Sequence, residues 1–118
     1  MFKMDLEYES EILFIRLIGN LNKRGSHKIN NYILPVIKKH KIKNVVLNLN
    51  ELNGIDSSGI NAIINVKSIT KCNKGNLYLC DNDNYLNKFI KSLNIKAISS
   101  EKSLILEKKV WERWIMRK

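Results

Sequence analysis

The stretch that decides the fold is residues 44–66, NVVLNLNELNGIDSSGINAIINV. Its first part, Val45 to Leu49, is an aliphatic run whose length and residue types predict a buried strand. A polar connection and Asp56-Ser57-Ser58-Gly59 follow. The next apolar residues are spaced for one face of a helix, namely Ile60, Ile63, Ile64, Val66 and Ile69. A strand, a short loop and a helix form half of a parallel β-α-β unit, so this stretch predicts an α/β fold.

The rest of the chain continues this alternation in both directions. Residues 2–8 and 12–18 are predicted strands joined by a polar turn, and the apolar residues over 29–37 predict a helix that Pro35 kinks or restarts. On the other side we expect a strand over 77–80, a helix over 85–93, a short strand over 96–99 and a last helix capped by Ser100. This order predicts one domain over residues 1–118, with a mixed, mostly parallel sheet packed against about four helices. Residues 108–118 are a candidate C-terminal helical extension.

The charge balance is strongly basic. The 118 residues carry 21 Lys and Arg against 11 acidic residues, a net charge of +10. Because the basic residues are spread along the sequence and are not interleaved with exposed aromatic residues, we expect solvated lysines and no direct contact with nucleic acid. The alternative is a functional basic patch, which requires a clustered Lys/Arg face and steep salt dependence.

Other features of the sequence indicate the compartment in which the protein acts and whether it binds a metal or cofactor. No apolar run approaches the roughly 18 residues of a membrane span, and the acidic N-terminus does not have the pattern of a secretory signal, so we expect a cytoplasmic protein. Cys72 and Cys80 lack the companions that a zinc site needs and are predicted to be ordinary reduced thiols. We therefore expect neither a metal nor a cofactor.

The segment Asp56-Ser57-Ser58-Gly59 is the candidate for chemistry. In an open parallel sheet, sites form beyond the carboxyl ends of the strands, where this loop lies. The first N–H groups of the following helix have no intrahelical acceptor, and they favour a negative group together with the helix dipole. A serine there either caps the helix or, once phosphorylated, places about −2 charge beside those groups. Spacing alone leaves both roles open, and plain capping is the commoner one.

Several segments together resemble the STAS family, and in particular the bacterial anti-sigma factor antagonists. The most specific is Ile55-Asp56-Ser57-Ser58-Gly59-Ile60 after an aliphatic strand. It is supported in order and spacing by residues 17–22 (LIGNLN), 74–79 (KGNLYL) and 89–95 (FIKSLNI). The likeness extends over nearly the whole chain, so it implies the STAS fold for all of it.

The resemblance also implies a mechanism. In that family a serine kinase that is also an anti-sigma factor uses ATP to phosphorylate the first serine of the motif, which is Ser57 here. The unphosphorylated protein binds this kinase, phosphorylation releases it, and a phosphoserine phosphatase resets the switch. Asp56, Ser58, Gly59 and Asn22 would shape the partner-binding loop. The nucleotide belongs to the kinase, so the chain itself needs no cofactor.

Two departures from the family pattern affect the expected partner surface. Asn22 and Asn48 stand where the family often has aspartate, and both changes remove negative charge from the loop side of the sheet. Asn22, which we include in the partner-binding loop, and Asn48 are therefore weaker candidates than Asp56, Ser58 and Gly59 for the surface around Ser57.

An enzyme is not expected. Ser57 and Ser58 have no His–Asp partnership, because His27 and His40 fall near the two ends of the first helix, and no Gly-rich phosphate loop is present. One alternative is a structural STAS module in a stressosome-like or lipid-transport assembly. In the tail, Val110, Trp111, Trp114 and Ile115 are spaced for one helical face, which either packs on the core or docks a partner or a second copy in a homodimer.

Overall fold

A computed structural model describes residues 1–82 and 90–107. Five strands form one sheet in the order β1-β2-β3-β4-β5. They are β1 (Phe2–Glu9), β2 (Ile12–Leu21), β3 (Asn44–Ile55), β4 (Asn76–Cys80) and β5 (Lys96–Ala97). Only the β1–β2 hairpin is antiparallel, while the other neighbours pair in parallel. The predicted mixed, mostly parallel sheet is confirmed.

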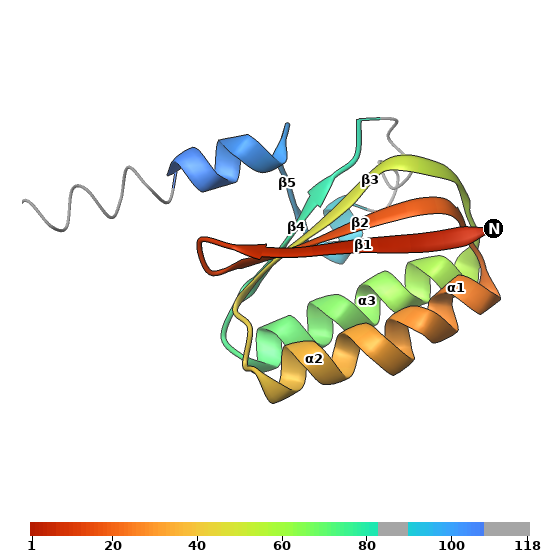
Figure 1. Ribbon diagram of the computed structural model, residues 1–118, viewed down its shortest axis with the longest axis horizontal. Coiled ribbons are helices and arrows are strands. Elements are labelled where there is room, and N and C mark those ends of the chain that lie inside the picture. The colour runs from red at the N-terminus through yellow and green to blue at the C-terminus, as the bar shows by residue number, and fades with distance from the viewer. Residues whose placement is uncertain (83–89, 108–118) are drawn as a thin grey trace, which may run out of the picture.

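Helices cover both faces of this sheet (Figure 1). On one face α1 (Lys23–Lys28), the π-helical turn η1 (Ile29–Ile33) and α2 (Leu34–Lys39) form a continuous helical stretch beside α3 (Ser57–Cys72). A short helix, α4 (Ile90–Leu93), leads into β5. On the other face a helix over 101–107 begins after Ser100, whose hydroxyl accepts a hydrogen bond from the Ser103 N–H.

The main core lies between the sheet and the α1–α3 layer. It is formed by alternate strand residues, such as Ile15, Leu17 and Leu47, and by helix residues at the predicted spacing, such as Ile33 and Ile63. A smaller apolar cluster joins the opposite face of the sheet to the helix over 101–107. It consists of Ile12, Phe14, Val46, Cys80 and Leu104. Because both faces of β2 and β3 are covered, these strands show apolar runs.

Two local features differ from the sequence-based expectation. β3 continues through the stretch predicted as a polar connection, because residues 51–55 pair with residues 18–21 of β2 across two register shifts. The expected irregularity at Pro35 is a π-helical turn just before it, in which the Leu34 N–H donates to Ile29 O. The predicted helix residues Tyr85, Leu86 and Phe89 lie outside the described residues, as does the tail over 108–118.

Candidate functional site

The segment around Ser57 opens α3 as the sequence predicts. Asp56 is the N-cap, and its Oδ1 accepts a hydrogen bond of 3.0 Å from the Gly59 N–H. The Ile60 N–H donates to Asp56 O at 3.0 Å, which starts the regular helical pattern. The carboxylate therefore satisfies one of the first helical N–H groups and fixes the direction in which α3 leaves the sheet.

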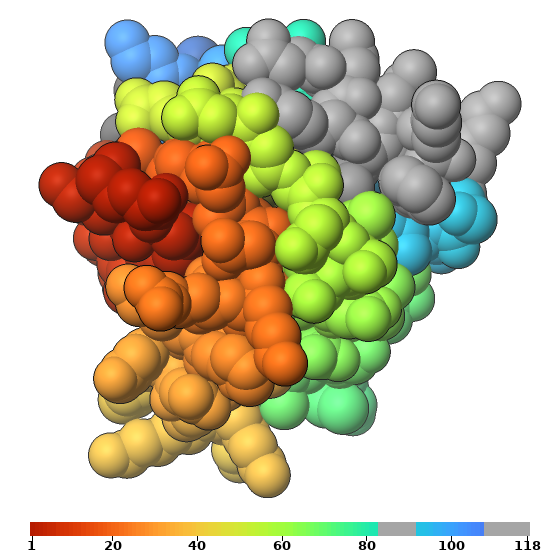
Figure 2. All heavy atoms as spheres, turned by 90° about the vertical axis from the view of Figure 1, so that its right-hand side faces the viewer, coloured from red at the N-terminus to blue at the C-terminus, as the bar shows by residue number. Residues whose placement is uncertain are grey.

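A second cap of the same construction lies next to it. Asn22 caps α1, and its Oδ1 accepts a hydrogen bond of 3.1 Å from the Gly25 N–H. The two caps are neighbours because Leu21 pairs with Ile55, the last residues of β2 and β3. In Figure 2 the orange start of α1 and the yellow-green start of α3 lie side by side on one face of the molecule. The structure thus brings Asn22 and the Asp56–Gly59 segment together.

Gly59 allows α3 to begin this close to the sheet. A Cβ at this position would lie 2.6 Å from Leu21 O and 2.8 Å from Cγ1 of Ile55. The Asp56 N–H donates to the same strand, to Leu21 O at 3.2 Å. A side chain at residue 59 would therefore push the start of α3 away from β2.

Ser57 is the first helical residue and is exposed, whereas Ser58 is half-buried. The backbone N–H groups of both serines donate no hydrogen bond within the described part of the chain. A phosphoryl group on Ser57 would lie at the positive end of a 16-residue helix, beside these two unpaired donors. Lys23 and Arg24, both exposed, open the neighbouring α1 and add positive charge. This end of α3 therefore has the charge and the hydrogen-bond donors that favour a negative group.

Asn48 does not lie with the other predicted loop residues. Its Nδ2 donates to Oε2 of Glu101 at 2.8 Å, and its Oδ1 accepts from the Asn50 N–H at 3.0 Å. Glu101 belongs to the helix on the opposite face of the sheet from α3. The expectation that Asn48 surrounds the partner-binding loop is therefore wrong, because alternation along β3 turns this side chain to the other face.

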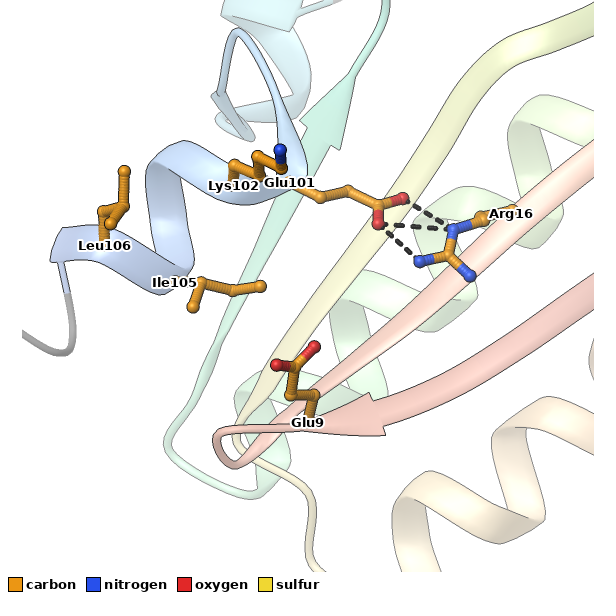
Figure 3. A pocket seen from close by; sticks show the side chains of 6 residues that line it. All are labelled: Glu9, Arg16, Glu101, Lys102, Ile105 and Leu106. Atoms are coloured by element: carbon orange, nitrogen blue, oxygen red, sulfur yellow. Dashed lines mark hydrogen bonds and ion pairs between the residues drawn. The ribbon is translucent and has the colours of Figure 1, made fainter.

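Asn48 belongs instead to a polar cluster centred on Arg16. Figure 3 shows the pairing of Arg16 with Glu101 in this cluster. The guanidinium pairs with Glu101 at 2.7 Å, with Glu7 at 2.8 Å and with Asp5 at 2.9 Å. These hydrogen bonds, the one to Glu101 foremost, raise the pKa of Arg16. Burial alone would raise the pKa of Glu101, but the hydrogen bonds from Arg16 and Asn48 and the charge of Arg16 outweigh it, so this pKa lies below its usual range.

The cluster was missed by reasoning from sequence. It borders a hollow of about 420 Å³ lined by Glu9, Arg16, Glu101, Ile105 and others. One signal was available, since Asp5 and Arg16 are direct partners in the predicted hairpin. The contact with Glu101, 85 residues later, has no sequence signal. Through Glu101 the cluster connects the helix over 101–107 to strands β2 and β3. We assign it a structural role and no catalytic one.

The described residues form one α/β fold with an exposed serine at the carboxyl ends of its central strands. The model of the STAS domain matches residues 3–104, so the chain belongs to the STAS domain family. An anti-sigma F factor antagonist of Paenibacillus polymyxa is 25% identical over 79 residues, which make up 67% of this chain and 68% of that protein.

Solved structures show the same fold. The Bacillus cell fate determinant SpoIIAA in its phosphorylated form matches with a TM-score of 0.76 at 20% identity, over 91% of this chain and 98% of that one. The anti-sigma factor antagonist SpoIIAA in its unphosphorylated form matches with a TM-score of 0.74 at 18% identity, over 91% and 96%. In the described ranges, no helix is both long and apolar enough to cross a bilayer.

Proposed function

We propose that this protein is an anti-sigma factor antagonist, a regulator rather than an enzyme, that acts in the cytoplasm. The observation that carries the proposal is the exposed Ser57 at the first position of α3, beside two backbone N–H groups that have no acceptor within residues 1–82 and 90–107. Support also comes from the relative that bears this description and from the likeness to SpoIIAA, which is known in phosphorylated and unphosphorylated forms.

In the proposed switch the unphosphorylated chain binds an anti-sigma factor that is also a serine kinase. The Ser57 Oγ attacks the γ-phosphorus of ATP held by that kinase, the bond to ADP breaks, and the hydroxyl proton passes to a base of the kinase. A phosphoserine phosphatase later hydrolyses the ester. Asp56 keeps capping α3 through the Gly59 N–H, so the backbone of the loop stays in place in both forms.

Phosphorylation changes binding because it adds about −2 charge to a contact surface. The Ser57 and Ser58 N–H groups, which have no acceptor in the described part of the chain, stabilise the phosphate in the isolated protein, and the partner must desolvate it on binding. A difference of about 3 kcal/mol between the two forms weakens binding more than a hundredfold. One exposed residue is thus sufficient for an on/off signal without refolding.

The proposal is tested by calorimetric titration of the chain into a candidate anti-sigma factor from the same organism. Ser57→Asp should weaken binding at least tenfold, since it places a negative charge at the first helical position. Ser58→Asp is the matched control, one residue further and half-buried, and should have a smaller effect. If both variants bind like the wild type, Ser57 is not part of the contact. A structural STAS module in a larger assembly then becomes the better interpretation.

A further inference from the structure

The fold gathers charge that is dispersed in the sequence. Residues 22–43 and 57–76, which form the α1–α3 layer and its connections to β3 and β4, hold ten of the 21 Lys and Arg and none of the 11 acidic residues. The remainder of the chain is balanced, with eleven basic and eleven acidic residues. The whole net charge of +10 therefore arises from this one layer.

Most of these charges lie at one corner of the layer, where α2 and α3 end and β3 and β4 begin. We call it the lysine corner; it consists of Lys38, Lys39, Lys41, Lys43, Lys71 and Lys74. Its two connections are tied together by Asn73, whose Nδ2 donates to Ile37 O at 3.0 Å and to Ile42 O at 2.9 Å. The Asn76 N–H also donates to Lys43 O at 2.7 Å. These hydrogen bonds hold the two lysine-bearing connections against each other.

The six lysines are available to a ligand. All are exposed, and none has an acidic partner among the described residues. Lysines at the ends of α2 and α3 also offset the helix dipoles, which accounts for Lys38, Lys39 and Lys71. The same explanation does not cover Lys41, Lys43 and Lys74, which follow the helices.

A small polar hollow continues the lysine corner on the β4–β5 side. It encloses about 110 Å³ and is lined by Lys67, Lys71, Lys96, Asn76 and Asn94, among others. Ammonium and amide N–H groups without a carboxylate suit a phosphate, whose oxygens accept hydrogen bonds from both. The Lys67 Nζ already donates to Leu93 O, so Lys71 and Lys96 are the better placed ammonium groups of this hollow. The hollow and the corner share Lys71 and therefore adjoin each other.

The side chains of the corner favour one kind of polyanion. The exposed large apolar residues of the described chain are Met1, Leu6, Tyr8, Tyr32, Val36 and Leu106, and none of them belongs to the lysine-bearing segments 38–43 and 71–76. An apolar hollow does adjoin the corner on the β1–β2 side, where Val36, His40 and Ile42 line it together with Tyr8 and Leu13. A basic surface with few apolar side chains suits a phosphodiester backbone, which binds through counterion release and polar contacts. Most protein interfaces need an apolar centre, and anionic lipid, which lysines also attract, is separated from nucleic acid by the vesicle measurement below.

We propose that the lysine corner binds the phosphate backbone of nucleic acid without reading its sequence. The surface lies at the amino ends of the parallel strands, the end of the sheet opposite Ser57, so the inference is independent of the proposed switch. It reverses the sequence-based expectation of no contact with nucleic acid. That expectation relied on the dispersal of the charges along the chain, which the fold removes.

The test is fluorescence anisotropy of the full chain with a labelled mixed-sequence 20-base-pair DNA duplex and a single-stranded RNA of the same length. About five phosphate contacts give a slope of about −4.5 for the logarithm of affinity against that of salt, or about a 500-fold loss between 50 and 200 mM salt on duplex DNA. The triple variant Lys39→Gln, Lys41→Gln, Lys74→Gln should reduce this slope by about 2.7.

A matched control separates a site from bulk charge. The triple variant Lys3→Gln, Lys28→Gln, Lys102→Gln lowers the net charge equally, at exposed positions outside the corner, and should keep nearly the wild-type slope. Equal losses in the two triple variants, or no binding of either nucleic acid at 50 mM salt, would overturn the proposal. So would binding confined to vesicles of anionic phospholipid, which would assign the corner to a membrane surface.

Discussion

Replacing Gly59 with alanine tests whether the start of α3 is held against β2 as tightly as the structure indicates. The added Cβ would lie 2.6 Å from Leu21 O, whereas ordinary contacts begin at 3.4 Å. The start of α3 must therefore retreat by roughly 0.8 Å or strain the strand, and such overpacking costs about 1–3 kcal/mol. Alanine regains up to about 1 kcal/mol of helix propensity. We expect a net loss of about 1–2 kcal/mol in the free energy of unfolding.

Gly25→Ala is the matched control, because Gly25 has the same position relative to its cap at the start of α1. There the added Cβ would meet the Phe2 ring at 3.0 Å and Cδ1 of Leu21 at 3.1 Å, side chains that can shift slightly. We expect this variant within about 0.5 kcal/mol of the wild type, since the helix gain offsets the small repacking cost. The assay is equilibrium urea unfolding. A Gly59→Ala protein as stable as the wild type, or equal losses in both variants, would refute the reasoning.

Three further predictions concern the other face of the sheet. Asn48→Asp replaces a donor to Glu101 with a second carboxylate, so urea unfolding at pH 7 should show a loss of about 1–3 kcal/mol; no loss would mean that this contact does not matter. Because the pKa of folded Glu101 lies below its usual range, its contribution to stability is present above the unfolded pKa of about 4.3 and is lost as the pH falls through the folded value. Glu101→Gln should therefore flatten the decline in stability below pH 5, and an unchanged slope would contradict this. Cys80 is buried and Cys72 is exposed. The pKa of the Cys80 thiol is raised to about 11, mainly by burial and to a smaller extent by the charge of Glu101. N-ethylmaleimide at pH 7.5 should thus add one label in native protein and two in urea, and rapid double labelling would show that Cys80 is accessible.

The order of elements and the loop at Ser57 could be predicted because they depend on local patterns. Aliphatic runs and helical spacing identified β2, β3 and α3, and Asp56 before a helix indicated its cap. The continuation of β3 through residues 51–55 (ELNGI) could not be predicted in this way. Pairing with β2 keeps those residues extended, although their composition resembles that of a loop.

The residues that sequence reasoning misplaced depend on contacts between distant segments. Asn48 was grouped with the loop by its place in the family pattern, but its partner Glu101 lies 53 residues away on the other side of the sheet. The clustering of lysines was missed for the same reason, since Lys39, Lys41 and Lys74 come together only when β3 and β4 pair.

The most direct test of the proposed switch is intact-mass analysis and peptide mapping after incubation with ATP and a candidate anti-sigma kinase from the same organism. The account predicts one added phosphate, on Ser57, that disappears in Ser57→Ala and persists in Ser58→Ala. A kinase that is active on another substrate but leaves this chain unmodified, or that phosphorylates Ser58 instead, would contradict it.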